Sequence, residues 1–193
     1  MIYREQSIDD FLDAVAGRRV TPAGGSATAV VGATGASLCE MVCTHTIEYD
    51  DHEETDLSEV REELHTLRTR LLDLADRDAE AVDALLAASD DDLPAAEKRA
   101  TGVPLTIAEA CLTVLEDAVV VTARGTPNAV PDAGTGAYLA RGALDASLFT
   151  VRYNTSDIDD PSFVADMEER TDAVETAATD AFEQVVANVR ADE

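Results

Sequence analysis

The sequence predicts an all-α fold, an antiparallel bundle of about six helices within a single domain that spans residues 1–193. Aromatic residues make up only 4% of the chain and tryptophan is absent, so the core must consist mainly of alanine, valine and leucine. Small aliphatic side chains of this kind favour closely packed helices over a β-sandwich. Apolar residues also recur at helical spacing over long stretches, whereas only the short segment 147–153 resembles a strand.

The first half of the chain predicts one short helix and two long ones. Ser7 can cap a short amphipathic helix that Gly17 ends. A loop then leads into a long helix in which most residues over 24–36 are small. The next helix is expected over 56–89, where leucine and alanine repeat in a heptad-like pattern.

The second half predicts three more helices. Pro94 lies near the start of the first, and Pro104 either kinks that helix or restarts it. Gly125 ends it, and after a turn another helix is expected over 132–149. A loop that contains Asn154 then leads into the last helix, expected over 161–190.

The chain has 40 acidic and 14 basic residues, a formal net charge of −26, and the acid is spread over its whole length. One interpretation is a surface that binds cations or a basic partner. The other is halophilic adaptation, in which dense carboxylates hold water and molar salt screens their repulsion. We favour the second, because acidic residues occur on nearly every predicted exposed face. No nucleic-acid partner is expected, since no arginine cluster is larger than Arg18–Arg19.

The three cysteines, Cys39, Cys43 and Cys111, are expected to be small buried thiols. His45 lies near two of them, but a zinc site needs about four such ligands, so no metal site is predicted. An odd cysteine count without a recognisable signal peptide indicates a cytoplasmic protein. The apolar segment 27–43 is shorter than the roughly 20 residues of a membrane span, so no membrane partner is expected.

Glycine is unusually frequent at the start of the second helix, although each interior glycine costs about 1 kcal/mol relative to alanine. Glycine lets another backbone approach closely, or leaves room for a flat ligand. The amides of Gly25 and Ser26, at the positive end of the helix, could attract an anionic or carbonyl group. A phosphate loop is not predicted, because no lysine follows the glycines.

Three segments, taken in order, resemble the cyclodeaminase/cyclohydrolase family, which includes methenyltetrahydrofolate cyclohydrolases and the C-terminal half of formiminotransferase-cyclodeaminases. The segments are FLDAVAGRRVTPAGGSATAVVGATGASLCEMV, RGTPNAVPDAGTGAYLARGALDASL and VRYNTSDIDD. The residues that match the family's motifs are Gly24, Gly25, Ser26, Asn128, Asp132, Gly134 and Asn154. The sequence departs from those motifs at Ala23, Thr126 and Pro131.

The resemblance implies a homodimer that binds folate near the dimer interface and hydrolyses methenyltetrahydrofolate to formyltetrahydrofolate in one-carbon metabolism. It implies no cofactor beyond the tetrahydrofolate substrate. The cyclodeaminase reaction stays open, in which formiminotetrahydrofolate closes to the same cyclic cation with loss of ammonia. We favour the hydrolase because this chain carries no transferase half. A non-catalytic folate-binding or interaction module is a further alternative, which the three departures would favour.

Asp132 is the predicted catalytic residue. Water must add to the one-carbon bridge of a delocalised cation, and a carboxylate can stabilise that cation and orient the water. As an N-cap, Asp132 would lie beside backbone amides that lower its basicity, and a purely capping role is the alternative. The predicted substrate-binding residues are Gly24, Gly25, Ser26, Asn128, Gly134, Tyr138, Arg141 and Asn154. Tyr138 either lies along the pterin or fills the core, and Arg141 could reach the glutamate tail of folate.

Overall fold

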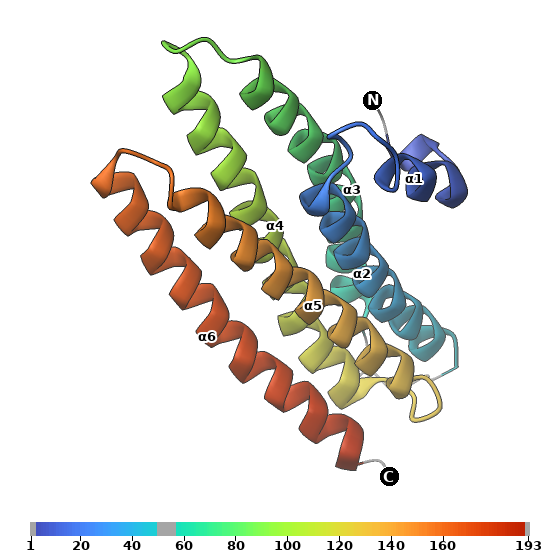
Figure 1. The fold of residues 1–193 in the computed structure, drawn as a ribbon. Coiled ribbons are helices and arrows are strands. Elements are labelled where there is room, and N and C mark those ends of the chain that lie inside the picture. The colour runs from blue at the N-terminus through green and yellow to red at the C-terminus, as the bar shows by residue number, and fades with distance from the viewer. Residues whose placement is uncertain (1–2, 50–56, 192–193) are drawn as a thin grey trace.

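The computed structural model describes residues 3–49 and 57–191, and every regular element in these ranges is helical. The prediction of an all-α bundle is therefore confirmed (Figure 1). A short 3-10 helix, η1 (Tyr3–Glu5), precedes six α-helices. These are α1 (Ile8–Val15), α2 (Gly24–Tyr49), α3 (Ser58–Ala87), α4 (Leu93–Arg124), α5 (Val130–Thr155) and α6 (Pro161–Ala191).

Helices α2, α3, α4 and α5 form a four-helix unit in which each packs against two neighbours along its edges. Helices α2 and α5 form the layer nearer the viewer in Figure 1, and α3 and α4 lie behind them. Helix α6 packs along α4 and α5, while η1 contacts α3. Two helix faces are therefore left open on opposite sides of the unit, one over α2 and α5 and one over α3 and α4.

Glycine allows α2 and α5 to cross at close range. A Cβ built on Gly35 would lie 2.6 Å from the backbone oxygen of Gly136, and one on Gly136 would lie 2.7 Å from the oxygen of Gly35. On another side of α2, a Cβ on Gly32 would lie 2.6 Å from Cys111 Sγ of α4. The small residues of α2 thus serve close packing, as one of the two sequence interpretations proposed.

Several predicted helix ends are confirmed. The Ser7 hydroxyl accepts a hydrogen bond from the Asp10 backbone N–H at 3.1 Å and caps α1. Pro94 lies in the first turn of α4, and Gly125 follows its last residue as the C-cap. The residue at which α3 was expected to begin, Asp56, lies outside the described residues.

Helix α4 does not restart at Pro104. The helix is continuous from residue 93 to residue 124, with the proline inside it and buried. Thr106 and Thr101, which flank the proline, donate their hydroxyls to helix carbonyls four residues earlier. Packing on both sides therefore outweighs the hydrogen bond that the proline cannot make.

Helix α5 starts earlier and ends later than predicted. It begins at Val130, with Pro131 in its first turn and Ala129 at the N-cap, so the prediction that Asp132 is the N-cap is wrong. Proline suits the first turn because its missing N–H would have no helical partner there. The helix continues to residue 155, so Asn154 belongs to its last turn rather than to a loop. The segment 147–153, the nearest strand candidate, is helical.

All three cysteines are free and buried, as predicted. Burial raises the pKa of each thiol to about 12, which removes thiolate reactivity near neutral pH. Helix α2 is long and apolar enough over Gly24–Glu48 to cross a membrane by length and composition alone. In the bundle, its apolar residues pack against α3, α4 and α5.

Candidate functional site

A surface hollow of about 540 Å³ lies where α2 ends and α5 begins. Met41 and His45 line it from α2, one helical turn apart. Thr126, Asn128 and Ala129 line it from the connection between α4 and α5, and Asp132 from the first turn of α5. This is a volume that can hold a drug-sized ligand. The structure thus places two predicted site residues, Asp132 and Asn128, in one hollow.

The connection that forms one wall of this hollow is held against α2. The Thr126 backbone N–H donates to Thr46 Oγ1 at 3.0 Å, which ties the connection to α2. A Cβ on Gly125 would lie 2.7 Å from Val121 O, so only glycine lets the chain turn this tightly out of α4. The Asp132 backbone N–H donates to Ala129 O at 2.9 Å, which sets the start of α5. The position of Asp132 is therefore determined by backbone contacts.

The side chains in this hollow supply complementary chemistry. Asp132 is exposed and offers a carboxylate, His45 offers an imidazole, and Asn128 offers an amide that can donate and accept. A carboxylate can stabilise a cationic ligand, while an imidazole can accept or donate a proton. Together they can bind a cationic ligand and transfer a proton.

Sequence reasoning missed His45 and Met41 as lining residues. His45 was considered only in relation to Cys39 and Cys43. The available signal was the four-residue spacing of Met41 and His45, which puts both on one face of α2. Nothing in the local sequence indicated that this face lies beside the start of α5.

The predicted group at the start of α2 does not lie in this hollow. Ser26 is fully buried, and its hydroxyl lies 3.0 Å from both Ala75 O and Asp78 Oδ2 of α3. A Cβ on Gly25 would overlap the Asp78 carboxylate, so this glycine makes room for a carboxyl group of the same protein. Gly24, by contrast, is exposed, with open space where a Cβ would be.

The start of α2 and Asp132 lie at opposite ends of the bundle. Cys39 Sγ lies 3.8 Å from Ala133 O, so residue 39 marks the level of Asp132 along α2. Ser26 is 13 residues earlier, a separation of about 20 Å at 1.5 Å per residue. Within one chain, the two predicted halves of the site are therefore separate.

The other predicted binding residues make contacts within the protein. Gly134 faces α6, where an added Cβ would lie 3.2 Å from Val189. The Tyr138 ring packs edge-on against Phe182 at 4.7 Å between centroids, yet the residue is 62% exposed, so it does not fill the core. Arg141 donates to both oxygens of Asp145, at 2.9 and 3.0 Å, and to Thr179 Oγ1 at 3.2 Å.

Asn154 joins the end of α5 to α4. Its side-chain amide donates to the backbone oxygen of Ala100 at 3.1 Å, in a half-buried position. Because α4 carries Pro104, the carbonyl of Ala100 has no N–H partner four residues later. Asn154 supplies the donor that the proline lacks, which gives this residue a clear structural role.

Two buried carboxyl groups were also missed. Burial raises the pKa of Asp78, and hydrogen bonds from Ser26 partly offset this. Burial, reinforced by the charges of Glu63 and Glu116, raises the pKa of Asp117 to about 7. Asp117 Oδ2 has no hydrogen-bond partner among the described residues. Each could have been found as an aspartate on the apolar stripe of a helix. Asp78 lies seven residues after Leu71, and Asp117 lies three residues after Val114.

Known proteins are similar to this chain in both sequence and structure. The sequence profile of the formiminotransferase-cyclodeaminase family matches residues 7–173. A methenyltetrahydrofolate cyclohydrolase from Methylorubrum extorquens is 35% identical over 173 residues, which cover 82% of this chain and 83% of that protein. A crystal structure of formiminotetrahydrofolate cyclodeaminase from Thermotoga maritima aligns with a TM-score of 0.94 and 26% identity, covering 98% of each chain. The chain therefore belongs to the formiminotransferase-cyclodeaminase family.

Proposed function

We propose that this protein hydrolyses methenyltetrahydrofolate to formyltetrahydrofolate. The relative that is 35% identical over most of the chain bears the name of this enzyme. The observation that carries the proposal is the hollow in which Asp132, Asn128 and His45 come together. A carboxylate facing a substrate cation, beside an imidazole that can move protons, is what this hydrolysis needs.

In the proposed reaction, water attacks the bridging carbon of the methenyl ring and loses one proton. Asp132 stabilises the cationic ring and orients the water, while His45 accepts the proton. One carbon–nitrogen bond of the adduct then breaks, the leaving nitrogen takes a proton, and the adduct hydroxyl loses one as the formyl C=O forms. The net result is one water consumed and one proton released. Asn128 would hold the pterin or the water through its amide.

The second candidate is the cyclodeaminase reaction, which the name of the Thermotoga maritima neighbour favours. Both reactions share the same cyclic cation, so one hollow could serve either. Two assays in molar salt separate them: loss of methenyl absorbance with added protein, and release of ammonia from formiminotetrahydrofolate. The proposal expects the first signal without the second. Ammonia release with no methenyl hydrolysis would reverse the assignment, and folate binding with neither reaction would indicate the non-catalytic alternative.

We further propose that the protein is a homodimer that pairs through the open face of α2 and α5. Two uncharged stripes line this face, one on each helix, and their residues are Ala27, Val31, Thr34, Leu38, Thr135, Leu139, Gly142, Ala146, Phe149 and Tyr153. Phe149 and Tyr153 are 69% and 68% exposed, and their rings stack at 6.5 Å between centroids. Two chains of charge −26 repel each other least where neither presents a charged side chain. A second copy of this chain is therefore the partner that best suits this uncharged face.

Light scattering tests the dimer directly. The expected mass is twice that of the 20.5 kDa chain. Phe149→Glu should produce the monomer, whereas Leu86→Glu, at a 64% exposed apolar position on α3, should leave the dimer intact. A monomeric native protein, or equal effects of both substitutions, would contradict this interface.

Such a dimer can reunite the two halves of the predicted site. Because α2 and α5 are antiparallel, a two-fold axis that lies in their open face and crosses the helices brings the start of one α2 beside the partner's hollow. We propose that Gly24 of one copy then lies near Asp132 of the other. Gly24→Leu and Asp132→Asn proteins, each with a tenth of native activity or less alone, should recover about a quarter of native activity after mixing and refolding. No recovery would mean that each site belongs to one chain.

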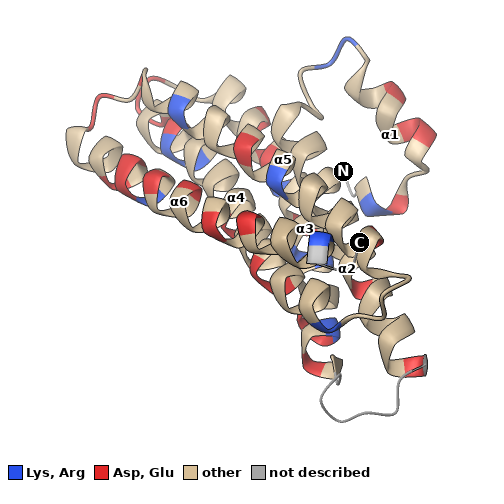
Figure 2. Ribbon diagram, turned by 90° about the horizontal axis from the view of Figure 1, so that it is seen from below, with Lys and Arg blue, Asp and Glu red and all other residues tan. Residues whose placement is uncertain are grey.

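We also propose that the protein is halophilic and cytoplasmic. Acidic residues lie on all six helices, with few basic residues among them (Figure 2). Three buried free thiols suit a reducing compartment. Immunodetection in fractionated cells tests the location, and a signal confined to the membrane or external fraction would contradict it.

A further inference from the structure

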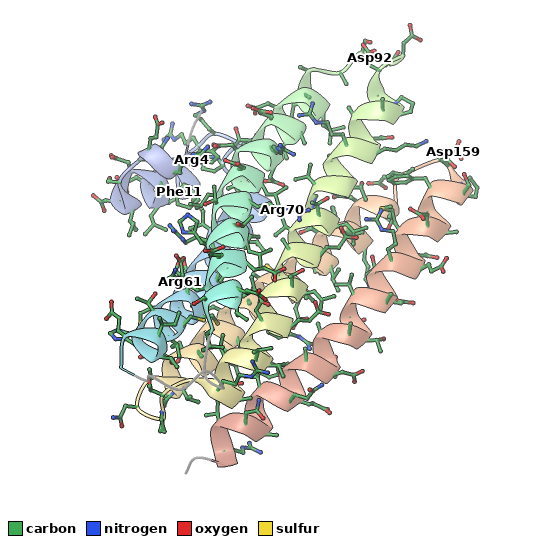
Figure 3. All side chains as sticks on the ribbon, turned by 180° about the vertical axis from the view of Figure 1, so that it is seen from behind. Arg4, Phe11, Arg61, Arg70, Asp92 and Asp159 are labelled. Atoms are coloured by element: carbon green, nitrogen blue, oxygen red, sulfur yellow. The ribbon has the colours of Figure 1, made fainter. Side chains whose placement is uncertain are left out.

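The open face of α3 and α4, on the opposite side of the four-helix unit from the α2 and α5 face, contains a second hollow of about 490 Å³. Arg70 and Arg77 line it from α3, and Thr106 lines it from α4. Figure 3 shows Arg70 between these two helices. This hollow shares no lining residue with the one that contains Asp132.

Arg70 and Arg77 make no ion pair among the described residues, and both line this one hollow. Elsewhere, Arg68, Arg141 and Arg170 each contact a carboxylate at 2.5–2.9 Å. Although the chain has 40 acidic residues, no carboxylate forms an ion pair with either of these two lining arginines among the described residues.

The nearest acidic residue does not neutralise the pair. Asp73 lies between Arg70 and Arg77 on α3 and lines the same hollow, but it forms an ion pair with Arg4 of η1 at 2.8 Å. Asp76, on the neighbouring side of the helix, accepts a hydrogen bond from the Tyr3 N–H at 2.8 Å. The wall of the hollow therefore carries two arginines and one aspartate, and that aspartate is already paired with Arg4 outside the hollow, within a protein of net charge −26.

The neighbouring hydroxyls and imidazole are already engaged. Thr69 and Thr106 donate their hydroxyls to helix carbonyls at 3.1 and 3.0 Å. His65 Nδ1 lies 3.0 Å from Glu40 Oε1 and 2.8 Å from Arg68 Nη2, so this edge of its ring is occupied. The arginine donors that line the hollow without an ion pair are the guanidinium groups of Arg70 and Arg77, each a planar fork that matches an oxyanion.

We propose that this hollow binds a small dianion whose oxygens are held by Arg70 and Arg77. The two Cα atoms are seven residues apart on one helix, about 10 Å, so their long side chains can grip one compact group from two sides. A dianion is favoured over chloride because two separate guanidinium forks can act on it at once. A phosphate group and a short dicarboxylate share this chemistry. The proposal is independent of the folate reaction at Asp132.

Calorimetric titration of the protein with inorganic phosphate or succinate, at constant molar KCl, tests the site. Saturable binding of at least one dianion is expected, and the probe that binds more tightly identifies the source. Arg70→Gln and Arg77→Gln should each weaken binding by about fivefold or more, the loss expected for one charge-assisted contact. Arg190→Gln is the matched control: it also makes no ion pair among the described residues, lies at the end of α6, and removes the same charge.

The control variant should bind the dianion as the native protein does, and all three variants should keep the native far-UV circular dichroism spectrum and methenyl turnover. Absence of saturable binding to the native protein would overturn the proposal. So would native affinity in both Arg70→Gln and Arg77→Gln, or an equal loss in Arg190→Gln, which would indicate a general charge effect. Because the readout is heat of binding, failure of the folate assignment would not affect it.

Discussion

Replacing Asp117 by asparagine should stabilise this protein above neutral pH. The carboxyl group is 9% exposed, its Oδ2 has no hydrogen-bond partner among the described residues, and Glu63 and Glu116 add negative charge nearby. Together these raise its folded-state pKa to about 7, from an ordinary value of 3.8. Asparagine has nearly the same shape but cannot ionise, so the substitution removes only the charge.

The direction follows from the two pKa values. Below about pH 4 the carboxyl is protonated in both the folded and the unfolded chain, so it does not change the free energy of unfolding. Between about pH 4 and 7 the unfolded chain ionises and the folded one does not, so the stability of the native protein falls as pH rises. Above about pH 7 the carboxyl is ionised in both states, and the loss of stability has reached its full value. At 1.36 kcal/mol per pKa unit, the shift sets an upper limit of about 4 kcal/mol on this cost.

Thermal unfolding in molar KCl at several pH values measures the effect. The Tm of Asp117→Asn minus that of the native protein should increase from about pH 4 to pH 7 and then level off, with a gain of about 5 °C or more by pH 8. Any penalty for burying the asparagine amide does not vary with pH, because the amide does not ionise. A Tm difference that is the same at all pH values would refute the reasoning.

Three further outcomes test packing and charge. Gly35→Ala should lower the stability by about 1–3 kcal/mol, because the added Cβ would meet the backbone oxygen of Gly136. Gly102→Ala, where the Cβ would enter open space, should raise the stability slightly, and thermal melts compare the two variants. Asn154→Ala should lower the stability by about 1 kcal/mol, because it removes the donor to the Ala100 oxygen, and it should leave KM unchanged. A raised KM at native stability would instead indicate that Asn154 binds substrate. Dilution below molar salt should lower Tm as carboxylate repulsion goes unscreened, and an unchanged Tm in dilute buffer would contradict the halophilic interpretation.

Periodicity and helix-end residues were enough to predict the number of helices and most of their limits. Ser7, Pro94 and Gly125 act locally, through one hydrogen bond or one backbone restriction, so their effect can be read from neighbouring residues alone. The start of α5 could not be read in this way. Asp132 and Pro131 both suit a helix start, and in the structure Pro131 lies in the first turn, after a connection that the Thr126 N–H ties to Thr46 of α2.

The site was harder to predict than the fold because its parts are joined by tertiary packing. Asp132 and Asn128 are neighbours in sequence, and the structure places them in one hollow. His45 reaches that hollow only because α2 and α5 cross at Gly35 and Gly136, a contact between residues about 100 positions apart. The glycines at residues 24 and 25 look alike in sequence, yet one faces solvent and the other makes room for Asp78.

Methenyl hydrolysis by Asp132→Asn protein in molar salt tests the central claim most directly, with Asp157→Asn as an exposed control of equal charge change. The substitution should lower kcat/KM by about tenfold or more while the circular dichroism spectrum and the mass by light scattering stay native. The control should keep native turnover. Equal, native rates in both variants would show that the carboxylate in the hollow has no part in the reaction.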